Sequence, residues 1–559
     1  MKSRTIVLIL GTAQFIMVLD STVMNVSISQ VVEDLDTTVP SLQLAITAYT
    51  LVMAAFMLTG AKFGDIWGRR RAFTIGLAVY GLGSLITALS PSIGVLLIGW
   101  SCVEGLGAVL VIPAIAALTA ASYEGRERAL AFALLGGIAG AGAAAGPLIG
   151  GFVTSTLTWR VVFAAESVTV AGLLLLVRRL PDSPGVPGAT LDRVGAALSA
   201  LGMGLTVFGI LKISSWGLFK PTGALTIGGT EITPFGLSIV PFLILAGLVV
   251  LGLFWRWEDR VEHEGGQPLL RPDLLRIPQL RAGASTVVSQ YLILAGTFFV
   301  LPLYLQLVLG KDALQTGLKV LPISAAMMVA ALFGPRLATR TSPRRVVQVG
   351  MGFLVVSILG LMATISPDLA DVLFAVSLAG FGAGVGLALS QLQNIVMSAV
   401  PEARSSEAGG IQGVSQNIGQ SLGTALIGAV LLTGLTTGFH NRVLADTSIP
   451  PQVQQQLVNG TEQGVPMVSK SDAENAAKKE GLNQSQTDTV IDAYSDAQIQ
   501  ALKQALFVAA AFVLVGFWFA RHLPGEALSE GEGEAHPKRM MRVEDGRPSV
   551  AVPTKGSAQ

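Results

Sequence analysis

Three acidic residues stand out because each lies inside a long apolar stretch: Asp20 in residues 5–27, Glu104 in 93–121 and Glu166 in 158–178. An ionised carboxylate at the centre of a bilayer costs roughly 2.5–3.5 kcal/mol, so such residues usually face a wet cavity or a bundle interior. At 1.5 Å per helical residue, all three lie roughly 10–17 Å below the same membrane surface. The pattern predicts one shared proton or cation site. The alternative is three separate acids, each hydrogen-bonded to neighbouring helices.

The composition indicates a membrane protein. The chain has 559 residues, 51% of them hydrophobic, with a mean hydropathy of +0.62. Only 13% are charged, against roughly 25% in soluble proteins. These values exclude a disordered chain and argue against a soluble enzyme. A net charge of +1 gives no basic field for nucleic acid.

Cysteine and histidine are too sparse for a metal centre. One cysteine, Cys102, excludes a disulfide framework, a zinc finger and an iron–sulfur site, and the four histidines have no metal-ligand spacing. We find no zinc-protease, nucleophile-elbow or P-loop motif, and no repeated filter-like loop typical of a channel. We therefore expect no metal, no cofactor and no enzymatic activity.

Fourteen apolar stretches are long enough to cross a bilayer, which takes roughly 20 residues of helix. They cover residues 5–27, 41–61, 72–91, 93–121, 129–151, 158–178, 190–211, 238–257, 281–308, 314–335, 344–364, 371–397, 405–434 and 502–520. Of the 37 Lys and Arg residues, 27 fall on the side of the N-terminus. The positive-inside rule therefore places both termini in the cytoplasm. We expect the chain to lie in the cell (plasma) inner membrane.

Two segments are too polar to cross a membrane. Residues 437–500 predict an outer loop with room for a short helical cap. Residues 524–559 are charged and contain Gly and Pro, so they predict a disordered cytoplasmic tail.

The segment after the second span reads Gly60-Ala61-Lys62-Phe63-Gly64-Asp65-Ile66-Trp67-Gly68-Arg69-Arg70-Arg71. Glycine lets two helices approach closely, and Asp65 at a helix end can bond both an arginine and a neighbouring helix N-terminus. The segment resembles motif A of the major facilitator superfamily, although Ala61 and Ile66 depart from the pattern. The resemblance implies a conformational latch made of Gly60, Gly64, Asp65, Gly68, Arg69 and Arg70.

The fifth span carries a stripe of small residues that suits close helix packing, with a proline that bends the helix. It resembles motif C of the antiporter branches of that superfamily through Gly142, Gly146, Pro147, Gly150 and Gly151. Residues 19–26 and 301–306 resemble the helix 1 and helix 9 signatures of the fourteen-span drug:proton antiporters. The resemblance covers residues 5–435 and the last span.

The resemblance implies an all-α membrane protein with the major facilitator fold. Two six-helix bundles would occupy residues 1–180 and 281–523, with two inserted helices in 181–280. Residues 334–340 look like a degenerate second copy of motif A, which supports an internal repeat.

The fourth span departs from the family pattern, because Ser101 replaces the usual Arg and Glu104 the usual Gln. Family models that use this Arg to tune the proton site therefore do not carry over. Candidate substrate-cavity residues are Asn25, Gln290, Tyr291, Tyr304, Gln391, Gln393 and Asn394. The alternative for those in the second bundle is a hydrogen bond between neighbouring helices. Further polar groups in span 405–434 are Gln412, Gln416 and Asn417.

We therefore predict a proton-coupled antiporter that exports drugs or other amphipathic, cationic small molecules by alternating access. The proton gradient would supply the energy at Asp20, Glu104 and Glu166, and the carrier would work as a monomer in the bilayer. One alternative is export of an endogenous metabolite, lipid or siderophore. Another is a membrane sensor or scaffold that transports nothing.

Overall fold

The computed structural model describes residues 2–525 apart from 38, 222, 224, 228–229, 368, 402–403, 448, 462–463 and 480–481. Most of the predicted tail, 524–559, therefore lies outside the described residues. Within the described part, fourteen helices are long and apolar enough to cross a membrane, which confirms the predicted number. Helices suit this environment because every backbone polar group is satisfied within its own segment.

The N-terminal six-helix bundle contains Asp20, Glu104 and Glu166. Its fourth membrane helix is one continuous run that begins as α5, passes through a π-helical stretch, η1, and ends as α6. The elements are α1 (Lys2–Val26), α2 (Ile28–Asp34), α3 (Val39–Trp67), α4 (Arg69–Ala88), α5 (Ile93–Leu96), η1 (Leu97–Glu104), α6 (Gly105–Ser122), α7 (Gly125–Thr156), α8 (Arg160–Leu176) and η2 (Val177–Arg179).

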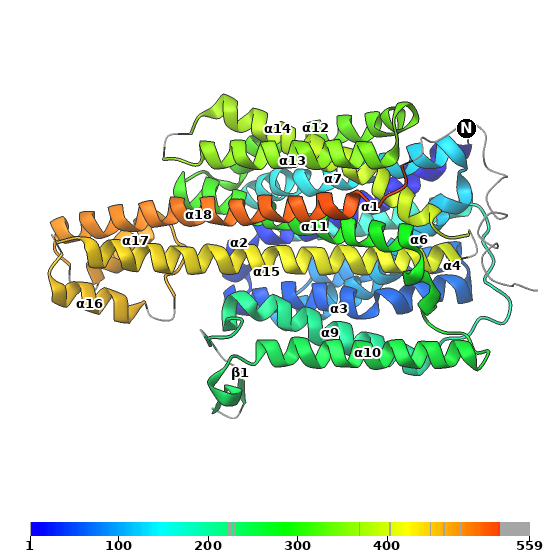
Figure 1. Cartoon of the computed structure of the whole chain (residues 1–559), viewed down its shortest axis with the longest axis horizontal. Helices are drawn as coiled ribbons and strands as arrows, with labels where there is room; N and C mark the ends of the chain where they lie inside the picture. Colours follow the sequence, from blue (N-terminus) through cyan, green and yellow to red (C-terminus); the bar gives the residue numbers. More distant parts are fainter. Residues whose placement is uncertain are drawn as a thin grey trace, which may run out of the picture.

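Two inserted helices, α9 (Arg193–Trp216) and α10 (Val240–His263), lie side by side beyond this bundle (Figure 1). The Asp192 side chain caps α9 by accepting from two backbone N–H groups of its first turn. Helix α9 packs against α3 and α15, whereas α10 packs mainly against α9 and has few buried residues. A small antiparallel hairpin, β1 (Leu225–Ile227) with β2 (Thr230–Ile232), and the turn η3 (Pro234–Gly236) join the two helices.

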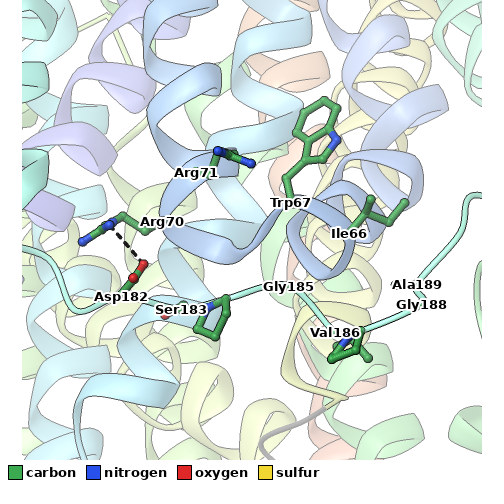
Figure 2. Close-up of a pocket in the computed structure, with 12 residues that line it drawn as sticks. Ile66, Trp67, Arg70, Arg71, Asp182, Ser183, Gly185, Val186, Gly188 and Ala189 are labelled. Carbon is green, nitrogen blue, oxygen red and sulfur yellow. Dashed lines mark ion pairs between the residues drawn. The ribbon is translucent and has the colours of Figure 1, made fainter.

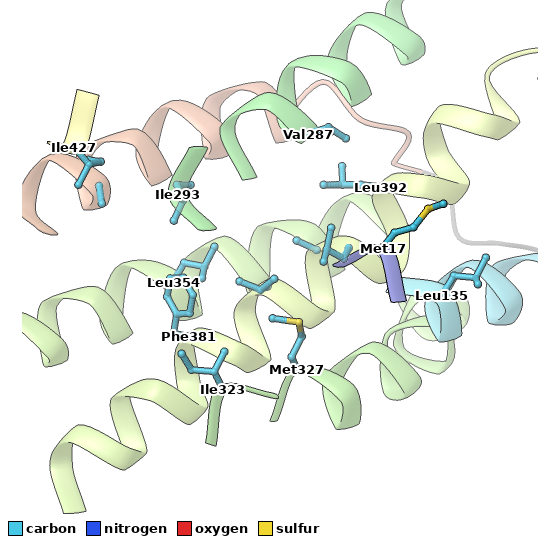
Figure 3. Packing of buried hydrophobic residues seen from close by; sticks show 14 of the residues in the cluster. Met17, Leu135, Val287, Ile293, Ile323, Met327, Leu354, Phe381, Leu392 and Ile427 are labelled. Carbon is cyan, nitrogen blue, oxygen red and sulfur yellow. The ribbon is translucent and has the colours of Figure 1, made fainter. Parts of the chain in front are cut away.

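The C-terminal bundle follows a short turn, η4 (Pro272–Arg276). It consists of α11 (Pro278–Leu303), continued by the π-helical η5 (Tyr304–Val308), then α12 (Ala313–Arg340), α13 (Pro343–Thr364), α14 (Asp371–Ser398), α15 (Ser405–Ala445) and α18 (Gln484–Ala520). Figure 3 shows the apolar packing that joins the bundles, with Met17 of the N-terminal bundle beside Leu392 of the C-terminal one; Leu135 and Met327 belong to the same buried cluster.

The predicted outer loop, residues 437–500, is mostly helical. Helix α15 continues to Ala445 and α18 begins at Gln484, so both helices extend beyond the others and carry α16 (Pro451–Gly460) and α17 (Lys470–Lys479) at their ends (Figure 1). Asn483 and Gln486 form a capping box that starts α18. We call α16, α17 and the helix ends that carry them the extension. The opposite end of the bundles is where α1 begins, and we call it the basic end because most Lys and Arg residues are predicted on the side of the N-terminus.

Close helix contacts through glycine join the two bundles. A Cβ on Gly137 of α7 would lie 3.3 Å from the Cβ of Ala331 on α12. A Cβ on Gly410 of α15 would lie 3.0 Å from the Cβ of Ala61 on α3. The bundles therefore meet along two seams, α7 with α12 and α3 with α15.

Candidate functional site

The three acidic residues meet inside the N-terminal bundle. One carboxylate oxygen each from Asp20 on α1, Glu104 on η1 and Glu166 on α8 lies within 4.8 Å of the other two. Asp20 and Glu104 are fully buried, and Glu166 is 3% exposed. The structure therefore brings together the three residues that the sequence places at one depth, and we call them the acid triad.

Two side chains donate hydrogen bonds of good geometry to the acid triad, and the Tyr49 and Tyr80 hydroxyls lie near Asp20 and Glu104. The Trp100 indole Nε1 donates to Asp20, at 2.9 Å from Oδ1 and 3.1 Å from Oδ2. The Ser84 hydroxyl donates to Glu166 Oε2 at 3.0 Å. Among the described residues, Glu166 Oε1 and both Glu104 carboxylate oxygens have no hydrogen-bond partner. Three buried carboxylates so close together cannot all remain charged, so the site requires protons or a cation.

Glycine contacts bring Glu104 to this position. A Cβ on Gly83 of α4 would lie 2.5 Å from the backbone N of Glu104, and one on Gly107 of α6 would lie 2.6 Å from the Cα of Tyr80. Helix α4 therefore touches the backbone of the helix that carries Glu104. The π-helical turn η1 changes the angle at which its side chains project, a device that is frequent at functional sites.

The donor Trp100 is itself held in place. The Tyr49 ring of α3 stacks on the Trp100 indole, with centroids 4.9 Å apart and planes 5° apart. The hydroxyl of Ser101, which stands where the family usually has Arg, donates to the Ala45 carbonyl at 2.7 Å. A neutral helix contact thus replaces the charge that the family pattern would supply.

The glycines of the motif C segment fix the position of α1 against α7. Cβ atoms on Gly142, Gly146 and Gly150 would lie 3.0 Å from the Phe15 carbonyl, 2.5 Å from Thr22 Cβ and 3.3 Å from Val23 Cα, respectively. Three glycines at intervals of four form one face of a helix, and this face contacts α1 on both sides of Asp20. Gly151 is also buried, and the side chain of Pro147 lies outside the described residues.

The motif A segment lies at the basic end. Gly68 adopts a φ of +89° between α3 and α4. A Cβ on Gly60 would lie 2.8 Å from a backbone carbon of Val109 on α6, and one on Gly64 would lie 3.8 Å from the Ser406 hydroxyl at the start of α15. The adjacent Asp65 carboxylate lies near the charges of Lys62 and Arg69. Asp65 is thus placed near Ser406 at the N-terminus of α15 of the other bundle, where burial and Glu407 oppose its negative charge and Lys62 and Arg69 favour it.

Arg70 interacts with a different acid. Its guanidinium pairs with Asp182 at 3.0 Å, in the segment that follows η2 and runs across the motif A turn (Figure 2). The Val186 backbone N–H of this segment donates to the Asp65 carbonyl at 2.8 Å. The connection to the inserted helices is thereby bound to the motif A turn.

Polar contacts that the sequence analysis did not anticipate join segments at the basic end. Arg404 donates to both carboxylate oxygens of Asp273, at 2.9 and 2.7 Å, and the Arg404 guanidinium lowers the pKa of Asp273. Arg128 of α7 donates to the Ser398 hydroxyl of α14 at 2.9 Å, which links the two bundles. In this conformation the bundles are in contact at the basic end.

Most of the predicted cavity residues make contacts within the C-terminal bundle. Gln290 donates to the Val385 carbonyl at 3.5 Å, Tyr304 to the Ser366 carbonyl at 2.8 Å and Gln391 to the Ser390 hydroxyl at 3.0 Å. Asn394 accepts from the Ser398 hydroxyl at 3.3 Å, Tyr291 is half-buried, and the side chain of Asn25 lies outside the described residues. Gln393 lines a cavity between the bundles.

That cavity measures about 20 Å³, which leaves room for about one water molecule. Helices α1, α6 and α7 form one wall, and α14 and α15 form the other. Its polar lining residues are Gln14, Gln393, Gln412 and Gln416. The sequence analysis missed Gln14, whose only signal is an amide within an apolar first span.

Comparisons with known proteins agree with this architecture. Residues 10–424 match the profile of the Major Facilitator Superfamily. The chain is 31% identical to the puromycin resistance protein pur8 of Streptomyces alboniger, over 81% of this chain and 85% of that protein. It is 27% identical to the multidrug resistance protein Stp of Mycobacterium tuberculosis, over 93% of each chain.

Solved structures show the same fold. The human organic anion transporter MFSD10 superposes with a TM-score of 0.58 at 11% identity, covering 93% of this chain and 99% of that one. The proton:xylose symporter XylE superposes with a TM-score of 0.52 at 12% identity, covering 75% and 86%. The family match and the drug-resistance relatives indicate a transporter rather than an enzyme. The chain is therefore a multi-pass membrane protein that belongs to the major facilitator superfamily.

Proposed function

We propose that this protein is a proton-coupled antiporter that exports amphipathic small molecules by alternating access. It would lie in the plasma membrane with both termini and the basic end in the cytoplasm. The observation that carries the proposal is the acid triad: three buried carboxylates within 4.8 Å, served by few donors. Protonation from the outside and deprotonation to the inside would drive the cycle.

The packing around α1 supports a route from the proton to the bundles. Helix α1 carries Asp20 and rests on the glycine face of α7 at Gly146. Another side of α7 contacts α12 of the other bundle, where a Cβ on Gly140 would overlap Met327. Charging or neutralising Asp20 would shift α1 on α7, and α7 would transmit the shift to the seam between the bundles.

Two further features suit an exporter. The relatives include the drug efflux pump JefA of Mycobacterium tuberculosis and a probable actinorhodin transporter of Streptomyces coelicolor, so efflux is the activity we carry over. The motif A segment, with Asp65 at the N-terminus of α15, would act as the latch of the state that is closed at the basic end.

The proposal is tested with purified protein in proteoliposomes under an imposed pH gradient. Cationic ethidium and a neutral fluorescent amphiphile are each tried as transported probe, and a pH-sensitive dye reports proton release. Asp20→Asn keeps the shape but removes the charge, so we expect probe-driven proton release to disappear. Asp496→Asn, at an exposed position on α18, is the matched control and should behave as wild type.

The outcomes separate the alternatives. Normal exchange of protons for probe by the Asp20→Asn variant would refute proton coupling at the triad. Transport of endogenous lipids or metabolites, but not of any dye, would favour the metabolite exporter. A wild-type protein that moves neither probe nor protons would point to a sensor or scaffold.

A further inference from the structure

The cavity between the bundles is lined by amides and not by charge. Four glutamines reach it: Gln14 from α1, Gln393 from α14, and Gln412 and Gln416 from α15. The remaining lining residues are apolar or glycine, so within the described residues no acidic or basic side chain borders this cavity. A carboxylate is the group that would attract a cation, and this cavity has none.

Two of these amides have unused hydrogen-bonding capacity. The Oε1 atoms of Gln393 and Gln412 are buried and have no hydrogen-bond partner among the described residues. Gln412 is only 3% exposed. An unpaired buried amide oxygen is unfavourable, so a ligand or water that donates hydrogen bonds at this position would be stabilised. Each glutamine also offers N–H donors, so the site can satisfy both donors and acceptors.

The acid triad lies elsewhere. Asp20 follows Gln14 by six residues on α1, a rise of about 9 Å and a rotation of about 240°. Asp20 therefore faces Trp100 inside the N-terminal bundle, whereas Gln14 faces the C-terminal bundle. None of the three carboxylates borders the cavity between Gln14 and Gln412.

We infer that this cavity, once widened, binds uncharged amphipathic molecules that carry hydrogen-bond donors and acceptors, and that the glutamines recognise them. This inference rests on the proposed export function but replaces the cationic substrate expected from the sequence. Apolar lining residues such as Ile115 and Phe132 would cover the rings of such a molecule. The acid triad would bind protons without contacting the substrate.

The test compares two pairs of fluorescent probes, one pair built on dansyl sulfonamide and one on naphthalimide. In each pair the probes differ only in a neutral 2-hydroxyethyl or a permanently cationic 2-trimethylammonioethyl tail. Binding is titrated to full-length protein in phosphatidylcholine nanodiscs, with empty nanodiscs subtracted. We expect the neutral member to bind at least about tenfold more tightly, since desolvating a cation without a counter-charge is unfavourable.

Variants assign the recognition to the amides. Gln412→Leu should weaken binding of the neutral probe about fivefold to tenfold, whereas Gln412→Glu should raise the affinity for the cationic probe. Gln420→Leu makes the same change at an exposed position of the same helix and should leave both affinities unchanged. Elution of each purified variant from a size-exclusion column as a single monodisperse peak verifies folding.

Three results would overturn the inference: tighter binding of the cationic probe, an unchanged neutral-probe affinity in Gln412→Leu, or no saturable binding of either neutral probe. Proton-coupled transport of the cationic probes alongside such a result would leave the proposed function intact. Conversely, glutamine-dependent binding of neutral probes without any dependence on a pH gradient would refute proton coupling and leave this inference standing.

Discussion

Replacing Gly146 with alanine should disturb the acid triad without touching it. The added Cβ would lie 2.5 Å from Thr22 Cβ and overlap the Thr22 hydroxyl. Carbon atoms in ordinary contact are about 3.5–4.0 Å apart, so α1 and α7 would have to separate by roughly 1–1.5 Å at this point. Asp20 lies two residues from Thr22 on α1 and would move with it. Overpacking of this kind costs about 1–3 kcal/mol of stability.

The same displacement should also slow transport. A displacement of about 1 Å in a functional group can reduce a rate by about 10²-fold, so we expect Gly146→Ala to slow proton-driven efflux by about tenfold or more. Efflux is measured in proteoliposomes under a fixed pH gradient, and stability by thermal unfolding of the purified protein. Gly172→Ala on α8 is the matched control, because a Cβ there meets nothing within 4 Å.

A second substitution should restore activity if the reasoning is right. Thr22→Gly removes the side chain that blocks the new Cβ, and the nearest remaining Thr22 atom is the backbone C, at 3.3 Å. Thr22→Ser keeps the Cβ and should not restore efflux. Wild-type efflux by Gly146→Ala alone would refute the tight contact. Failure of Thr22→Gly to improve on Gly146→Ala would show that the damage does not arise at this contact.

Three further outcomes are expected. Gly68→Ala should lower thermal stability more than Gly188→Ala, since both residues have positive φ but only Gly68 abuts a backbone carbonyl; equal losses would contradict that contact. Asp273→Asn should lower the melting temperature at pH 7, because Arg404 holds the pKa of Asp273 below its ordinary value. The difference from wild type should begin to shrink below about pH 4 and disappear at still lower pH, once folded Asp273 is protonated. A difference that persists at low pH would refute the ionic origin. Replacing residues 445–495 with a short linker should leave the efflux rate within about twofold of wild type. The reason is that α16 and α17 pack on the ends of α15 and α18, away from the acid triad. A greater loss of efflux at normal expression would assign the extension a role in transport.

The sequence predicted the membrane helices because each carries its own signal, a long apolar run. Beyond the membrane this signal is absent, and the sequence allowed only a short helical cap where the structure has α16, α17 and the ends of α15 and α18. Residues 437–500 are polar, so a hydropathy window leaves them as loop, although Asn483 and Gln486 carry the capping-box pattern of a helix start. Apolar residues such as Phe439 and Tyr494 pack in the extension, and the sequence did not show that they meet.

The depth of the acid triad along its helices could be predicted from the sequence, whereas its hydrogen-bond partners could not. Counting residues placed Asp20, Glu104 and Glu166 at one level, since helical rise is fixed. The Trp100 indole reaches Asp20 from a different helix, and its orientation depends on the π-helical turn η1. Neither feature has a local sequence signature. The cavity lined by Gln14, Gln393, Gln412 and Gln416 also has no local sequence signature, because it forms only where the two bundles meet.

The separation of the acid triad from the glutamine cavity bears on how coupling would work. If proton and substrate shared one carboxylate, each would exclude the other directly, and the substrate would have to be a cation. Here Asp20 and Gln14 lie on different sides of α1, so the two ligands would communicate through the position of that helix. Helix α1 is also the one that the glycine face of α7 contacts most closely, at Gly146. On the proposed mechanism, the motif C glycines hold α1 directly against α7, so a shift of α1 on protonation of Asp20 would be passed through α7 to the seam with α12. A carrier built in this way would accept chemically varied neutral substrates while keeping one proton site.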